Sequence, residues 1–123
     1  MKHYMTLDPA PFETINNGTK TIELRLNDEK RQLIRINDEI IFENKADRKN
    51  RIAVRVTNLF HFKSFEELYG VLPLLKCGYT DENIHRAKPE DMEKFYSKKQ
   101  QEKYGVLGIE IEKTDKAYDK TNS

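Results

Sequence analysis

One short segment of the chain carries side chains that could do chemistry together. Lys20, Glu23 and Arg25 follow directly on an Asn17-Gly18 turn. Glu23 and Arg25 are two residues apart in an alternating run, so both side chains fall on one face of a strand. A carboxylate between a lysine and an arginine stays ionised and accepts hydrogen bonds, for example from the exocyclic amine of a nucleobase. The segment therefore predicts a ligand-binding cleft.

The two cations of this segment have different uses. Arg25 presents a planar fork of donors that suits a phosphate or a carboxylate, whereas Lys20 is a point charge on a flexible stem. Thr21 shares the strand face of Glu23 and Arg25. The same residues also fit a solvated row of surface ions that contributes under about 1 kcal/mol to stability. The residues alone leave both interpretations open.

A second group of candidate residues lies nearer the C-terminus. Lys94, Lys98 and Lys99 surround or follow Tyr96, and Tyr104 comes shortly after them. Basic side chains beside aromatic rings suit single-stranded nucleic acid, with phosphates on the lysines and bases stacked on the tyrosines. Residues four apart are neighbours on a helix, which would pair Lys94 with Lys98. A charged solvent face with an inward-packed Tyr96 explains the same pattern.

Composition narrows the class of protein. The 123 residues predict one domain, and a net charge of +1 excludes a histone-like nucleic-acid coat. Cys77 is the one cysteine, so an intramolecular disulfide or a cysteine-rich zinc site is excluded. The three histidines lack metal-ligand spacing, and no glycine-rich phosphate loop occurs. We expect a cytoplasmic protein without signal peptide, membrane span, metal or cofactor.

Periodic patterns place these residues on a small α+β fold. Alternation predicts strands around residues 3–7, 21–26, 39–43, 52–57 and 107–111; helices are expected at 9–17, 64–70, 80–86 and from Pro89, with a restart at Ser97. Residues 44–50 predict a charged hairpin tip longer than two residues. Without regular crossover helices, the pattern favours a mixed or antiparallel β-barrel with short peripheral helices. Residues 113–123 are expected to form a flexible tail.

The motif Gly18-x-Lys20-x-x-Glu23-x-Arg25 resembles the signature of the ASCH domain, a small barrel family related in fold to the PUA RNA-binding domain. Further segments resemble the family in the expected order: Met5-x-Leu7 with Pro11-Phe12, then 36–42, where Asn37 replaces the usual glycine, then 65–69, and finally 96–109. The resemblance reaches to about Glu112, so it predicts an ASCH-like domain over residues 1–112.

This resemblance implies a PUA-like barrel that binds RNA or a nucleotide-like ligand in a cleft beside the motif. The expected ligand-binding residues are Lys20, Thr21, Glu23, Arg25, Tyr96, Ser97 and Tyr104, with Lys94, Lys98 and Lys99 on the nucleic-acid backbone. One bacterial branch implies an alternative, an amidohydrolase for an acylated pyrimidine nucleoside such as acetylcytidine. Lys20 would then be base or nucleophile and Glu23 the proton relay. That branch uses a threonine where this chain has Glu23, which favours binding.

Overall fold

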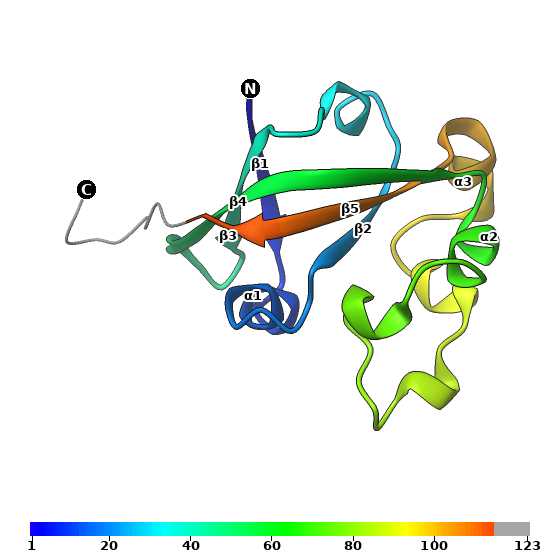
Figure 1. Ribbon diagram of the computed structural model, residues 1–123. Coiled ribbons are helices and arrows are strands. Elements are labelled where there is room, and N and C mark those ends of the chain that lie inside the picture. Colours follow the sequence, from blue (N-terminus) through cyan, green and yellow to red (C-terminus); the bar gives the residue numbers. More distant parts are fainter. Residues whose placement is uncertain (115–123) are drawn as a thin grey trace.

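Five strands form one sheet in the order β1-β3-β4-β5-β2, seen in the computed structural model (Figure 1). The structure describes residues 1–114, so the predicted tail lies outside the described residues from residue 115 on. The strands are β1 (Lys2–Leu7), β2 (Ile22–Leu26), β3 (Glu39–Asn44), β4 (Asp47–Phe62) and β5 (Val106–Lys113). The helices are α1 (Pro9–Asn16), α2 (Phe65–Tyr69) and α3 (Lys98–Tyr104), and single 3₁₀ turns cover Arg31–Leu33, Leu74–Cys77, Ile84–Arg86 and Pro89–Met92.

The sheet is mixed and curls into a half-barrel. β1 pairs with β3 in parallel, whereas the other three pairings are antiparallel. Side chains join the two edge strands across the open seam: Arg25 Nη2 of β2 donates to the Thr6 carbonyl of β1 at 2.9 Å. Lys30, in the loop after β2, donates to the Tyr4 carbonyl of β1 at 2.8 Å. The expected α+β class, a mixed or antiparallel β-barrel with short peripheral helices, is confirmed, and the barrel takes the form of a curled mixed half-barrel.

Two apolar clusters hold the fold together, one on each face of β2. The first fills the inside of the curled sheet beneath α1, and the second packs α2 and the 3₁₀ turn at residues 74–77 against the other face of β2. The first contains Met5, Phe12, Ile15, Phe42, Val54 and Ile109 among others, and the second contains Ile22, Leu24, Phe65, Leu68, Leu72 and Val106 among others. Each cluster has fully buried large side chains, which is where burial contributes most per residue.

The polar face of β2 is buried, although the alternating pattern is also typical of a strand with one solvated face. Glu23 lies opposite Ile109 and Arg25 lies opposite Leu107, and both partners belong to the first apolar cluster. Counted over the whole residue, Glu23 is 3% exposed. Because successive side chains alternate between faces, the apolar side of β2 packs on α2 while its charged side faces the barrel interior.

The hairpin between β3 and β4 differs from the expected long tip. Only Lys45 and Ala46 form the turn, and β4 begins at Asp47. The register shifts next to the turn: Asn44 lies opposite Asp47, but Glu43 lies opposite Arg51. Polar side chains satisfy the backbone there: Asn44 Oδ1 accepts from the Ala46 amide at 2.9 Å, and Asp47 Oδ1 accepts from the Lys49 amide at 3.2 Å. These local bonds stabilise a tight turn that composition alone suggested was a loop.

The predicted helix from Pro89 is wrong in length. It ends as a 3₁₀ turn at Met92, and the chain turns through residues 93–95 before α3 begins. Lys94 and Lys98 are therefore not neighbours on one helix, whereas Lys98 and Lys99 both lie on α3. The predicted cap at Ser97 is confirmed, since its hydroxyl accepts from the Gln100 amide at 3.2 Å and Gln100 bonds back at 2.9 Å.

Candidate functional site

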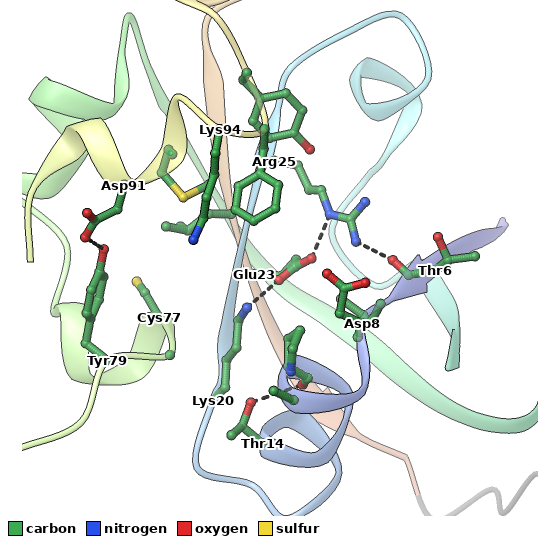
Figure 2. A pocket seen from close by; sticks show the side chains of 18 of the residues that line it. Thr6, Asp8, Thr14, Lys20, Glu23, Arg25, Cys77, Tyr79, Asp91 and Lys94 are labelled. Atoms are coloured by element: carbon green, nitrogen blue, oxygen red, sulfur yellow. Dashed lines mark hydrogen bonds and ion pairs between the residues drawn. The ribbon is translucent and has the colours of Figure 1, made fainter. Parts of the chain in front are cut away.

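A pocket of about 700 Å³ opens at the seam of the half-barrel (Figure 2). One wall comes from the end of β1, the start of α1 and the charged face of β2, and the other from residues 69–96. Its lining includes Thr6, Asp8, Lys20, Glu23, Arg25, Lys45, Tyr69, Cys77, Tyr79, Asp91, Lys94, Phe95 and Tyr96. The volume lies within the range of pockets that enclose small molecules.

Glu23 lies between two cations at the base of this pocket. Lys20 Nζ is 2.7 Å from Glu23 Oε1, and Arg25 Nε is 2.7 Å from Glu23 Oε2. All three side chains are largely buried, with exposed fractions of 11%, 5% and 12% for Lys20, Glu23 and Arg25. The cluster is therefore a desolvated ion triad and not a solvated surface row.

The triad fixes the charge of its central carboxylate. Burial alone would raise the pKa of Glu23, but Lys20 and Arg25 outweigh burial and lower that pKa from 4.5 to about 2. Burial likewise opposes the charge of Arg25, yet Glu23 and the Tyr96 hydroxyl raise the pKa of Arg25 above its ordinary value. At neutral pH Glu23 is an ionised acceptor, and Arg25 is fully charged.

Local backbone geometry brings Lys20 to Glu23 although it precedes β2. Gly18 adopts φ +86° after α1, a conformation that glycine reaches at little cost. The chain then folds back, with the Lys20 amide donating to the Thr14 carbonyl at 3.0 Å and the Thr21 amide donating to the Lys76 carbonyl at 2.9 Å. Because Lys20 precedes β2, the alternation of side chains along that strand does not set its direction, and its side chain reaches the same pocket as Glu23.

The opposite wall holds a chain of hydrogen bonds that the sequence analysis did not identify. Tyr79 donates its hydroxyl proton to Asp91 Oδ2 at 2.6 Å, and the hydroxyls of Tyr69 and Tyr79 are 2.7 Å apart. The bond from Tyr79 lowers the pKa of Asp91, while burial raises the pKa of Tyr79. These residues are ten or more positions apart along an irregular segment, so no periodicity relates them.

Aromatic and basic side chains form the rim. Tyr96 stacks on the core ring of Phe65, with centroids 6.0 Å apart, and Lys94 Nζ lies 5.3 Å from the centroid of Phe95. Phe95 is 56% exposed, which is high for a large apolar side chain. In Figure 2, Lys94 extends toward the space between the two walls. An exposed ring and an exposed ammonium beside a pocket suit a flat, partly anionic ligand.

The structure brings some of the expected site residues together and separates others. Lys20, Glu23, Arg25, Tyr96 and Lys94 line the pocket. Outside its lining lie Thr21, Ser97, Tyr104, Lys98 and Lys99. Thr21 joins β2 to β5 through its carbonyl, which accepts from the Ile111 amide at 2.9 Å. Ser97 caps α3, and Tyr104 packs against the second apolar cluster.

Cys77 lines the pocket as a neutral thiol. It is 6% exposed, and burial raises its pKa to about 11. A thiolate is the nucleophilic form, and the raised pKa disfavours it at neutral pH. Within residues 1–114, no group of three or more His, Cys, Asp or Glu side chains is placed to hold a metal ion. The described helices include none that is long and apolar enough to cross a membrane.

Two solved structures have the same fold as this chain and match it over nearly its full length. The crystal structure of hypothetical protein PH0355 is 33% identical, with a TM-score of 0.76, and the match covers 93% of this chain and 100% of that one. The solution structure of protein PF0455 from Pyrococcus furiosus is 31% identical, with a TM-score of 0.72 and coverage of 94% and 100%.

A solved structure of lower sequence identity has the same fold. A serine-to-alanine mutant of ZmASCH from Zymomonas mobilis is 13% identical with a TM-score of 0.63, and the match covers 89% of this chain and 66% of that one. No curated protein matches the chain. The ASCH domain profile matches residues 5–115, which run from the middle of β1 to the end of β5 and include the whole pocket. The chain therefore belongs to the ASCH domain family and has its PUA-like fold.

Proposed function

We propose that this chain binds a nucleotide of RNA, or a nucleotide-like ligand, in the pocket at the barrel seam. The observation that carries the proposal is the ionised Glu23 carboxylate, held at 2.7 Å by both Lys20 and Arg25 at the base of a pocket of about 700 Å³. A carboxylate offers about four acceptor positions, and these two contacts use two of them. The others can accept from an exocyclic amine of a base.

Some hydrogen-bond donors of the two cations bond other protein groups, and the rest remain for a ligand in the pocket. Arg25 gives Nε to Glu23 and Nη2 to the Thr6 carbonyl, so its main part is to position Glu23 and to join the strands. The Lys20 ammonium has three donors, and its contact with Glu23 uses one. We assign Lys20 to a carbonyl or phosphate oxygen of the ligand, and Phe95 and Tyr96 to the flat face of the base.

A hydrolase is the alternative for the same pocket. In that reading Lys20 acts as base or nucleophile on an acylated pyrimidine nucleoside, and Glu23 relays the proton. A relay must take up a proton during the reaction, and a carboxylate whose pKa is lowered to about 2 takes one up poorly at neutral pH. Glu23 also stands where the hydrolysing branch of the family has a threonine. Both observations favour binding over hydrolysis.

The proposal is tested with two nucleotides that differ at the group Glu23 would read. Cytidine monophosphate carries an exocyclic amine where uridine monophosphate has a carbonyl. Isothermal titration calorimetry should show roughly tenfold tighter binding of the cytidine nucleotide, since a mismatched edge costs about 1–3 kcal/mol. Equal affinities, or no binding of either nucleotide at millimolar concentration, would overturn the proposal.

A further inference from the structure

The hairpin formed by the end of β3 and the start of β4 carries an excess of positive charge, and its Lys45 lines the pocket. We propose that this basic hairpin tip, residues 43–51, binds the phosphates of RNA nucleotides that flank the one in the pocket. The inference rests on the proposed function and adds to it a path for the strand. It differs from the sequence-based expectation, which placed the backbone on Lys94, Lys98 and Lys99.

The charge balance of the tip supports this path. Over nine residues it has four basic and two acidic side chains, an excess of two positive charges, while the entire chain has a net charge of only +1. The basic residues are Lys45, Arg48, Lys49 and Arg51. Affinity for nucleic acid depends on such local clusters, because each phosphate contact releases a condensed counterion.

Backbone and side-chain contacts hold the tip at the pocket. The Lys45 amide donates to the carbonyl of Leu7 at 2.8 Å, which attaches the turn to the end of β1. Lys45 also lines the pocket, and its Nζ is 3.6 Å from Asp8 Oδ1 in a pair that is more than half exposed. An RNA chain that leaves the pocket beside Asp8 would therefore contact Lys45 first.

The cations beyond Lys45 are only partly neutralised. Arg48 and Arg51 share a single carboxylate, at 3.3 Å and 2.8 Å from Glu43. Their side chains are 63% and 43% exposed. Two guanidinium groups on one carboxylate leave a positive excess, and exposed guanidinium forks suit phosphate oxygens.

The competing path along α3 has weaker support. Residues 88–103 carry five basic and four acidic side chains over sixteen residues, so their excess is a single positive charge. Lys94 is the one of the three expected backbone lysines that lines the pocket. Lys98 and Lys99 are exposed on the first turn of α3, and they provide a matched control for the hairpin.

The experiment compares two double variants that each remove two exposed cations: Arg48→Gln with Lys49→Gln, and Lys98→Gln with Lys99→Gln. Fluorescence anisotropy with a labelled ten-nucleotide RNA of mixed sequence is measured across salt concentrations. The hairpin variant should bind about tenfold more weakly at low salt, with a log–log salt slope shallower by about one. The α3 variant should match the wild-type protein. Cytidine monophosphate should bind all three proteins equally, because it lacks flanking phosphates.

The outcomes separate this inference from the function on which it rests. A loss in the α3 variant alone, an equal loss in both variants, or no loss in either would overturn the assignment and leave the proposed function standing. A parallel loss of cytidine monophosphate affinity in the hairpin variant would place the effect inside the pocket and also overturn it. If neither the RNA nor the nucleotide binds the wild-type protein, both the proposed function and this inference fail.

Discussion

Replacing Glu23 with glutamine removes one charge from the buried triad and almost nothing from its volume. Lys20 and Arg25 would then lie in the barrel interior without their shared counter-ion. A pKa lowered from 4.5 to about 2 corresponds to about 3 kcal/mol of stabilisation of the charged carboxylate by the fold. Because Glu23 is 3% exposed, solvent screens little of this interaction. We expect Glu23→Gln to lower the free energy of unfolding by about 3 kcal/mol at pH 7.

The stability lost in Glu23→Gln depends on pH. A depressed pKa gives stability that is complete above the unfolded-state value of 4.5 and is lost as the pH falls through about 2. The glutamine variant lacks this pH-dependent contribution to stability, because glutamine does not ionise. The difference between wild-type and variant free energies of unfolding should therefore shrink by about 2 kcal/mol between pH 7 and pH 3.

Urea unfolding followed by circular dichroism at the two pH values measures this difference directly. Glu13→Gln is a suitable control, since Glu13 is exposed on α1, and its difference from wild type should stay within about 0.5 kcal/mol. A loss below about 1 kcal/mol at pH 7 for Glu23→Gln would refute the argument that the triad is desolvated. A loss that is the same at pH 3 would refute the assigned direction of the pKa shift.

Three further changes test other parts of the site. Arg25→Lys should lower the free energy of unfolding by about 2 kcal/mol in urea, because a lysine cannot bond Glu23 and the Thr6 carbonyl with the same fork geometry. Tyr79→Phe should lower it by about 1 to 2 kcal/mol in thermal unfolding, because Asp91 loses its hydroxyl donor. Acetylcytidine incubated with the protein should stay intact on chromatography, because the lowered pKa of Glu23 makes this carboxylate a poor proton relay.

Each of these changes has a matched comparison. Arg55→Lys alters an exposed pair with Glu112 and should lower the free energy of unfolding by less than about 0.5 kcal/mol. If Arg25→Lys lowered it by no more than this, the fork geometry of Arg25 would not contribute to stability. Tyr4→Phe alters a half-exposed tyrosine and should be neutral. Turnover of acetylcytidine that disappears in Lys20→Ala would establish the hydrolase in place of the binding function.

The sequence predicted those parts of the fold that depend on local chemistry. Strand alternation identified β1, β2, β3 and β5, and the capping residues Ser64 and Ser97 located the starts of α2 and α3. Asn37, which stands where the family has glycine, adopts φ +78° as that position requires. These features succeed because a few neighbouring residues determine them.

The parts that the sequence missed depend on contacts between distant residues. Alternation placed Glu23 and Arg25 together, but it could not decide between solvent and the barrel interior, because that depends on where α1 and β1 pack. Tyr79 and Asp91 lie on 3₁₀ turns and loops, where side-chain direction follows no period. The segment after Pro89 failed as a helix for a related reason, since an early turn after Met92 lets Tyr96 reach Phe65.

The charges on β2 are best understood against the apolar residues on its other face. Ile22 and Leu24 show that this strand can bury hydrocarbon, and an apolar replacement for a buried ion cluster is often neutral or stabilising. A triad kept for stability alone would therefore be a poor choice at this position. It makes sense if Arg25 joins the seam through the Thr6 carbonyl while the triad presents a fixed carboxylate to the pocket. Ligand binding and seam closure then share one set of contacts, so a bound nucleotide should raise the thermal stability of the whole domain.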